Sequence, residues 1–205
     1  MDVLSDEFYD ARERDLKKRL KPKRFRHVQG VADTAERLAR LYGVDARTAR
    51  LAGLLHDWDK AYDDEQIRRR AIEFEVQVDP YVLDEMPRLL HGPTAAAALR
   101  REWPDLPEEV LQSIERHTTG AVDMSDLDMV VYIADAIEPS RDFDGVPELR
   151  EAVGKVSLEE LFVRTFRHIF LMLVGRRKRL HPQTVEVWNH YITRARAAAG
   201  KGGKA

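Results

Sequence analysis

Apolar residues recur at intervals of three and four along most of the chain, and this spacing predicts amphipathic helices. The clearest stripe lies between residues 24 and 42 and consists of His27, Val31, Ala35 and Leu38. Gly43 follows it as the expected stop, because glycine tolerates the backbone conformation that ends a helix. Asp45 is well placed to cap the next helix, which leads through small apolar residues to His56.

Further helices are predicted at residues 5–20, 64–75, 93–102, 107–117, 147–153, 157–174 and 182–198, and from Asp123 or Ser125 to Pro139. Residues 76–93 contain several prolines and are predicted to be irregular or short-helical. The run MVVYI at 129–133 could form a strand, but its flanks favour a helix and one strand makes no sheet. The predicted fold class is therefore all-α.

The expected domain organisation is a charged N-terminal helix at 1–20, a helical bundle at 21–185, and a C-terminal segment at 186–205. That last segment comprises the end of a helix and a disordered tail, GKGGKA.

Composition narrows the chemistry. The formal net charge of −2 gives no global reason to expect DNA or an anionic membrane surface as a partner. The N-terminus lacks the apolar core of a signal peptide, and no run approaches the ~18 apolar residues of a membrane span, so a cytoplasmic protein is expected. There is no cysteine, which leaves His, Asp and Glu as the strong metal ligands. The sequence leaves a homodimer possible.

Several polar residues fall where the apolar pattern places the interior. The stretch LAGLLHDWDK (51–60) ends its apolar run with the pair His56-Asp57, and His27, His91, His117 and Asp135 show the same inward placement. Each alone is compatible with a hydrogen-bonded core residue. Together they need a compensating charge, which a divalent cation supplies, because imidazole and carboxylate suit Fe, Mn, Co, Ni or Zn.

The order of these residues, H…HD…D, resembles that of HD-domain phosphohydrolases, which are helical enzymes named for the His-Asp pair. The segments LLHGP (89–93), RHTTG (116–120) and YIADAIEPSR (132–141) extend the resemblance to the YqeK-type HD hydrolases. Those enzymes cleave diadenosine tetraphosphate symmetrically into two ADP. The resemblance spans roughly residues 20–185.

The resemblance implies that four residues, His27, His56, Asp57 and Asp135, hold a metal. His91 and His117 stand where two-metal members have two further histidines, with Asp57 able to bridge, so a dinuclear centre is implied, with iron as the expected ion. The metal would lower the pKa of water toward neutrality and offset phosphate charge, which would give Asp57 a catalytic role as well. One departure is Asp59, at a position expected to be small or apolar, where it either supports the site from behind or faces solvent.

Candidate substrate contacts surround these ligands. Lys60, four residues after His56, is a candidate catalytic and phosphate-binding residue, or else an exposed lysine at a helix end. Gly92 and Thr94 open a helix beside His91, which suits an anion, although Thr94 could serve only the helix. Thr118 and Thr119 either contact substrate or simply end their helix. Arg141 is a further candidate for phosphate or base.

Three functions are compatible with these residues, and each involves a dinucleotide or nucleotide ligand. The first is symmetrical hydrolysis of diadenosine tetraphosphate. The second is hydrolysis of another nucleotide, such as a nucleoside 5′-phosphate or a cyclic dinucleotide. The third is a non-catalytic nucleotide-binding or ribosome-associated scaffold, which the intact set of ligands disfavours.

Overall fold

A computed structural model describes residues 2–202, with side-chain surroundings for residues 2–196, and every regular element in that part of the chain is helical. The helices are α1 (Asp6–Arg19), α2 (Pro22–Tyr42), α3 (Ala46–Leu55), α4 (Asp64–Glu73), α5 (Pro80–Glu85), the 3₁₀ helix η1 (Pro87–Leu90), α6 (His91–Glu102), α7 (Glu108–Arg116), α8 (Asp126–Ile137), α9 (Val146–Ala152), α10 (Leu158–Gly175) and α11 (Thr184–Gly202). The all-α prediction is confirmed, and MVVYI lies inside α8.

Local chemistry explains most helix ends. Asp45 caps α3 by accepting a hydrogen bond from the Thr48 backbone N–H at 2.7 Å. Ser125 caps α8 and forms a reciprocal capping box with Asp128. Gly43 ends α2 with a φ of +77°, in the left-handed region that glycine enters without strain.

Several predicted boundaries differ from the observed ones. α4 ends at Glu73 rather than residue 75, and α11 begins at Thr184 rather than residue 182. α6 begins at His91 rather than residue 93, because η1 runs directly into it and Pro93 occupies its first turn. α11 continues to Gly202, so the helix includes the first three residues of the predicted tail GKGGKA. The rest of that tail, residues 203–205, lies outside the described residues.

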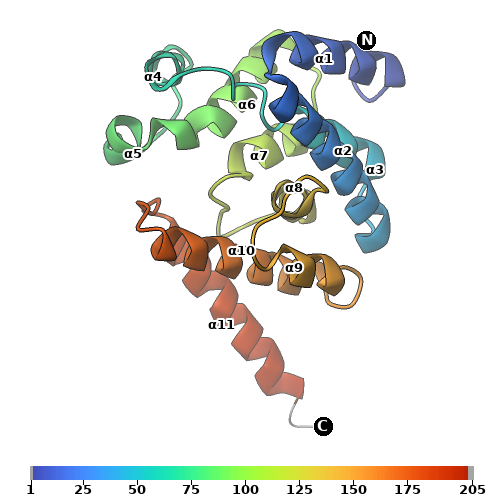
Figure 1. Cartoon of the computed structure of the whole chain (residues 1–205), viewed down its shortest axis with the longest axis vertical. Coiled ribbons are helices and arrows are strands. Elements are labelled where there is room, and N and C mark those ends of the chain that lie inside the picture. Colours follow the sequence, from blue (N-terminus) through green and yellow to red (C-terminus); the bar gives the residue numbers. More distant parts are fainter. Residues whose placement is uncertain (1, 203–205) are drawn as a thin grey trace.

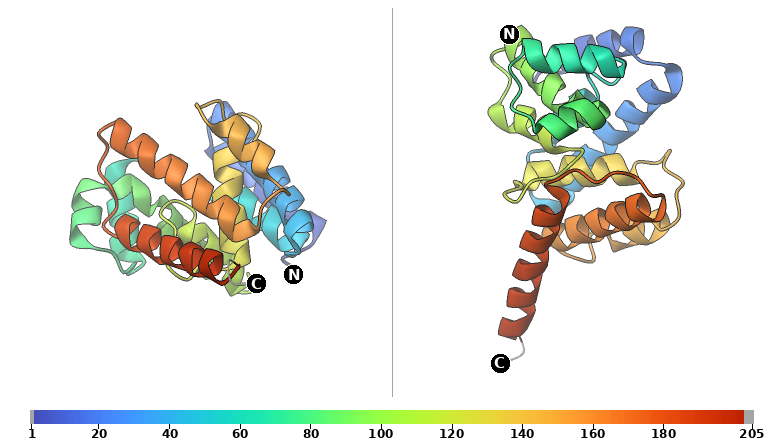
Figure 2. Two further views of the ribbon diagram at one scale, coloured as in Figure 1. Left: turned by 90° about the horizontal axis from the view of Figure 1, so that it is seen from below. Right: turned by 90° about the vertical axis from the view of Figure 1, so that its left-hand side faces the viewer.

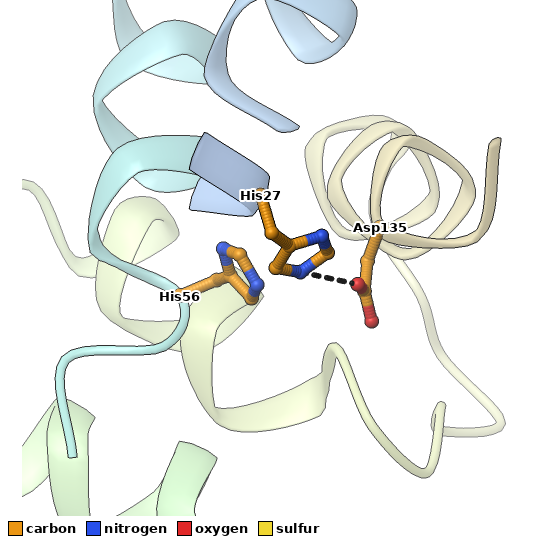
Figure 3. A group of neighbouring side chains, drawn as sticks. All are labelled: His27, His56 and Asp135. Atoms are coloured by element: carbon orange, nitrogen blue, oxygen red, sulfur yellow. Dashed lines mark ion pairs between the residues drawn. The ribbon is translucent and has the colours of Figure 1, made fainter. Parts of the chain in front are cut away.

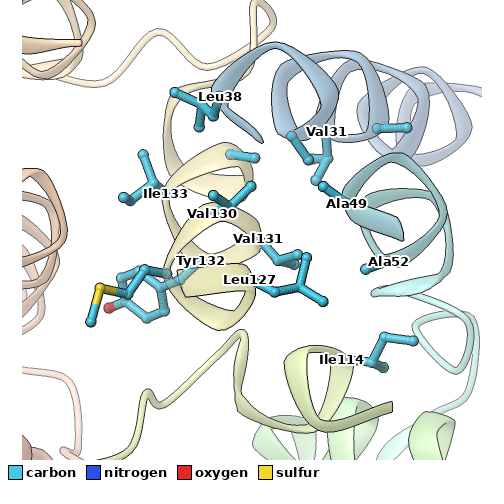
Figure 4. Packing of buried hydrophobic residues seen from close by; sticks show 14 of the residues in the cluster. Val31, Leu38, Ala49, Ala52, Ile114, Leu127, Val130, Val131, Tyr132 and Ile133 are labelled. Atoms are coloured by element: carbon cyan, nitrogen blue, oxygen red, sulfur yellow. The ribbon is translucent and has the colours of Figure 1, made fainter. Parts of the chain in front are cut away.

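Helix α8 lies at the centre of the molecule and packs against α2, α3, α7 and α10 (Figure 1). Its apolar residues meet those of α2 and α3, as Figure 4 shows for Val31, Ala49, Val130 and Val131. All four are fully buried. Burying a side chain the size of valine contributes about 1.5–3 kcal/mol relative to leaving it exposed, so this interface fixes α8 firmly against the α2–α3 pair.

The remaining helices extend this core on two sides. On one side, α4, α5 and η1 enclose a small second cluster formed by Ile67, Ala71, Val82 and Leu90. On the other side, α9 and α10 pack beneath α8, and α11 packs on α10 before projecting from the body (Figures 1 and 2). α1 contributes Phe8 and Leu16 to the main core. No helix among the described residues is long and apolar enough to cross a membrane.

Candidate metal centre

The six predicted ligands come together where several helices end. His27 lies in α2 and Asp135 in the last turn of α8, whereas His56-Asp57 directly follows α3, His117 follows α7, and His91 is the first residue of α6. Figure 3 shows the side chains of His27, His56 and Asp135 pointing toward one another from three elements. The five other than Asp135 are buried, and the Asp135 side chain is 26% exposed.

The four imidazoles are oriented in the same way. His56, His91 and His117 each lie 2.7 Å through Nδ1 from a backbone carbonyl three residues earlier, of Gly53, Arg88 and Ile114. A carbonyl only accepts hydrogen bonds, so Nδ1 carries the proton and Nε2 keeps its lone pair. His27 places Nδ1 2.9 Å from Oε1 of Glu138. All four Nε2 atoms are thereby left as potential ligands.

The Nε2 atoms converge on the two aspartates. His27 Nε2 lies 3.0 Å from Oδ1 of Asp135, and His56 Nε2 lies 3.4 Å from Oδ2 of Asp57. The other Asp57 oxygen, Oδ1, is 3.1 Å from His91 Nε2 and 4.0 Å from His117 Nε2. The two oxygens of Asp57 therefore face two different groups of histidines, which is the arrangement required of a bridging carboxylate.

Several of these atoms lack a suitable protein partner. Among the described residues, Nε2 of His27 and Nε2 of His56 are buried without a hydrogen bond, because their lone pairs face carboxylate oxygens, which also only accept. Nε2 of His91 lies 3.0 Å from Nε2 of His117, and two neutral lone pairs repel each other at that distance. A buried unsatisfied polar group costs about 1–3 kcal/mol. A cation among these atoms removes the conflict.

The donor set accordingly fits a divalent metal that accepts nitrogen and oxygen ligands. Two groups of three residues among the described part of the chain could each hold an ion, because the ligand atoms within a group all lie within 4.8 Å of one another. The first group is His27, His56 and Asp135, and the second is His56, Asp57 and His117. His56 belongs to both groups.

The protonation states also suit metal binding. Burial by itself would raise the pKa of Asp57 and Asp135, but neighbouring imidazoles and the positive charges of Lys60 and Arg141 hold both pKa values well below the usual range. Burial lowers the pKa of His91 and lowers that of His117 well below its ordinary value. Ionised aspartates and neutral imidazoles are the forms that bind metals. His56 differs, because burial would lower its pKa but the adjacent Asp57 carboxylate raises it, so metal binding there would compete with protonation.

Three basic side chains border the centre. The Lys60 ammonium lies 3.1 Å from His91 Nε2 and 3.7 Å from Asp57 Oδ1, and Arg141 Nη2 lies 2.5 Å from Asp135 Oδ1. Sequence reasoning missed the third, Arg24, whose Nη1 donates to Asp57 Oδ2 at 2.9 Å. Its signal was available, since Arg24 precedes His27 by about one helical turn and so shares its face.

Glu138 was also missed, and it supports the centre from behind. Its side chain is 1% exposed and contacts His27 through Oε1. The Ser140 backbone N–H donates to Oε2 at 2.7 Å, and the Ser140 hydroxyl donates to Oε1 at 2.5 Å. A histidine ligand commonly donates its second N–H to such a carboxylate. The sequence contained one signal for this role, because Glu138 is an acidic residue three positions after the candidate ligand Asp135.

The other predicted contacts differ in their surroundings. Thr118 Oγ1 lies 3.0 Å from His117 Nε2, at the centre itself, whereas Thr119 donates to the Gly120 carbonyl at 3.3 Å. Thr94 is fully buried with Oγ1 3.4 Å from the His91 carbonyl. A Cβ added to Gly92 would lie 2.7 Å from the Ile114 carbonyl oxygen, so this glycine permits the close approach of α6 to α7.

Asp59 neither supports a metal ligand nor faces solvent, which were the two predicted alternatives. It is fully buried, yet its oxygens accept hydrogen bonds from Arg70 at 2.8 and 3.0 Å rather than supporting a metal ligand. The guanidinium of Arg19 lies 4.0 Å from Asp59 and covers the ring of Trp58. Trp58 is 2% exposed and packs edge-on against Trp103, as a core residue does.

Comparisons with known proteins agree with this geometry. The HD domain family model matches residues 24–140. A symmetrical bis(5′-nucleosyl)-tetraphosphatase of Bacillus subtilis is 30% identical over 87% of this chain and 94% of its own, and one of Halalkalibacterium halodurans is 34% identical over 86% and 93%. The crystal structure of a predicted HD superfamily hydrolase involved in NAD metabolism from Clostridium acetobutylicum has a TM-score of 0.84 and 36% identity, covering 91% of this chain and 97% of that one.

The fold is thus that of an HD hydrolase, and the chain belongs to the HD domain family. Within that family it is similar, over most of its length, to proteins named as symmetrical bis(5′-nucleosyl)-tetraphosphatases. The matched residues 24–140 include all six candidate ligands. The boundaries predicted at residues 20 and 185 stay a prediction.

Proposed function

We propose that this protein is a metal-dependent hydrolase that cleaves diadenosine tetraphosphate symmetrically into two ADP. The observation that carries the proposal is the convergence of four Nε2 atoms on two carboxylates, with Asp57 facing both histidine groups. The names of the relatives support the substrate. The net reaction adds one water across the central phosphoanhydride, so that one ADP gains the water oxygen and the other keeps the former bridging oxygen.

The chain's own residues have separate tasks in this reaction. His27, His56, Asp57, His91, His117 and Asp135 would hold the metal. A bound divalent ion supplies Lewis acidity and a lowered pKa for water. Arg24, Lys60 and Arg141 border the centre and would attract and orient the anionic phosphate chain, since fixed positive charges stabilise negative charge that develops on phosphoryl oxygens. The backbone carbonyls and Glu138 hold the imidazoles in position.

We further propose that the ion is iron and that the centre is dinuclear, as the two faces of Asp57 suggest; manganese, cobalt, nickel and zinc suit the same ligands. Metal analysis of anaerobically purified protein should approach two ions per chain. His91→Ala should reduce this to about one, because it removes a ligand from one side of Asp57 only. A wild-type content of one ion that His91→Ala leaves unchanged would establish a mononuclear site instead.

The function is tested by incubating the metal-loaded protein with a panel of dinucleotides and mononucleotides and identifying the products. Two ADP from diadenosine tetraphosphate support the proposal, and AMP plus ATP contradict the symmetric cut. His56→Ala and Asp57→Ala should lose metal and activity while retaining the helical circular dichroism spectrum. His190→Ala, in α11 outside the centre, is the matched control and should retain both. Metal binding without turnover of any nucleotide would favour the scaffold.

A further inference from the structure

An apolar cavity lies beside the metal centre and is not used by the catalytic groups. One part of its lining is the face of α10 that carries Phe166, Ile169, Phe170 and Leu173, and another part is Met86 and Leu89 from the segment before α6. Thr118 and Thr119 also line it. Ligand sites are typically mostly apolar with a few polar groups that fix orientation, and this cavity has that character.

Thr118 connects the cavity to the metal centre. Its side chain lines the cavity, and its Oγ1 is also 3.0 Å from Nε2 of the candidate ligand His117. A molecule with its phosphates at the centre can therefore place an attached group in the cavity, one side chain away.

The α10 wall lies outside the part of the chain that matches the HD domain family model. That match ends at residue 140, whereas α10 spans Leu158–Gly175. All six candidate ligands lie inside the match. The candidate ligands thus belong to the part shared across the HD domain family, whereas the cavity depends on a helix beyond it, within the length that matches the tetraphosphatase relatives, which is where substrate selectivity is expected to reside.

The cavity is partly closed by side chains at its rim. Its volume is about 80 Å³, below the several hundred Å³ of ordinary ligand sites. Arg179, another lining residue, forms an ion pair with Glu85 at 2.6 Å, and the Arg179 side chain is 59% exposed. An exposed ion pair is weak, so Arg179 and the neighbouring flexible Met86 can move aside for a ring to enter.

We infer that this cavity seats one nucleobase of the substrate and thereby sets which phosphoanhydride is cut. The inference rests on the proposed function. A purine has apolar faces that suit the side chains of α10, and polar edges that suit Thr119 and His181, which also lines the cavity. The links of a tetraphosphate chain are chemically alike, so the metal centre alone cannot select the middle one. A base held at a fixed distance from the centre selects the middle link, because it fixes which phosphoanhydride lies at the metal centre.

The test fills the cavity without touching the centre. Leu173→Trp replaces a leucine of the cavity lining by a side chain with a large indole ring. The control, Leu171→Trp, adds the same ring to the same helix at a position that is 52% exposed and does not line the cavity. Calorimetry on the metal-loaded proteins compares the affinity for ADP with that for pyrophosphate. Leu173→Trp should weaken ADP binding about 10- to 100-fold, in keeping with the energy of stacking one base. Pyrophosphate binding should not change, and Leu171→Trp should bind both as the wild type does.

Product analysis of the same proteins tests the position of the cut. Wild type and Leu171→Trp should give ADP alone, whereas Leu173→Trp should give AMP and ATP as well, because the unanchored chain can shift along the centre. Unchanged ADP affinity in Leu173→Trp, or an equal loss of ADP and pyrophosphate binding, would overturn the inference.

A second variant covers the case in which Leu173→Trp does not fold. Phe170→Ala shortens the same wall at a partly buried position, and it should lower the ratio of ADP affinity to pyrophosphate affinity. An unchanged ratio would contradict the inference. The binding comparison involves no turnover, so it decides the role of the cavity even if wild type does not cleave the tetraphosphate. Failure of the proposed function would show instead in the wild-type products.

Discussion

Nδ1 of His27 lies 2.9 Å from Oε1 of Glu138, although 111 positions separate the two residues in the sequence. This contact joins α2 to the residue that ends α8 and aims Nε2 of His27 at the metal centre. The orientation of one ligand therefore depends on a carboxylate that binds no metal itself.

Glu138→Gln should lower metal affinity about 10- to 100-fold, the usual effect of altering a residue that supports a ligand. The amide oxygen can still accept from Nδ1, but the negative charge that makes the imidazole a stronger ligand is lost. Titration of the metal-loaded protein with a competing chelator measures the affinity. Glu109→Gln, at an exposed position on α7, is the control and should match the wild type. Equal affinities in both variants would show that Glu138 serves the fold alone.

Gly30→Ala should act on the same ligand from the other side of Glu138. A Cβ at residue 30 would lie 2.7 Å from Oε2 of Glu138, so the carboxylate has to move away from its place behind His27. Metal affinity should fall by about the factor seen for Glu138→Gln, and combining the two substitutions should add little, because coupled residues are not additive. Gly175→Ala is the control, because no atom of the described residues would lie within 4 Å of the added Cβ. Additive losses in the double variant would contradict this mechanism.

The sequence predicted the helices because they depend on local pattern. The stripe through His27, Val31, Ala35 and Leu38 indicated which face of α2 is buried, and that face carries a candidate ligand. The inward placement of several polar residues indicated a metal site, and the resemblance to HD hydrolases supplied the six candidate ligands that the structure brings together.

The sequence could not predict the partners of buried charges. Arg24 shares the face of His27, and Glu138 follows Asp135 by three residues, but only the packing of α2 on α8 and on the end of α3 shows that each contacts a candidate ligand from another element. Asp59 looked unusual for the same reason. Its partner Arg70 lies in α4, and no periodicity links the two. The cavity beside α10 likewise needs segments that are distant in the chain.

Arg24→Ala and Lys60→Ala should separate substrate handling from metal binding. Each removes a positive charge at the rim of the centre, and losing a charged hydrogen bond of about 1.5–3 kcal/mol lowers kcat/KM about 10- to 100-fold. Both proteins should keep their metal, because neither side chain is a ligand. Steady-state kinetics and metal analysis measure the two effects. Lys23→Ala, exposed on the same helix as Arg24, should behave as wild type, and metal loss in Lys60→Ala would give Lys60 a structural role.

Arg70→Ala should destabilise the fold without affecting the metal centre. The substitution leaves the fully buried carboxylate of Asp59 with Arg19 at 4.0 Å as its nearest cation, and removing one partner of a buried ion pair costs about 3–5 kcal/mol. The free energy of unfolding, measured with urea on metal-free protein, should fall by about this amount. Arg69→Ala is the matched control, since Arg69 lies next to Arg70 in α4 but is exposed and has no ion-pair partner in the part of the chain that is described. Removing both members of the pair, as Arg70→Ala with Asp59→Ala, should restore part of the loss because no charge is then left buried. A double variant less stable than Arg70→Ala by the full cost of Asp59→Ala would show that the two side chains act independently.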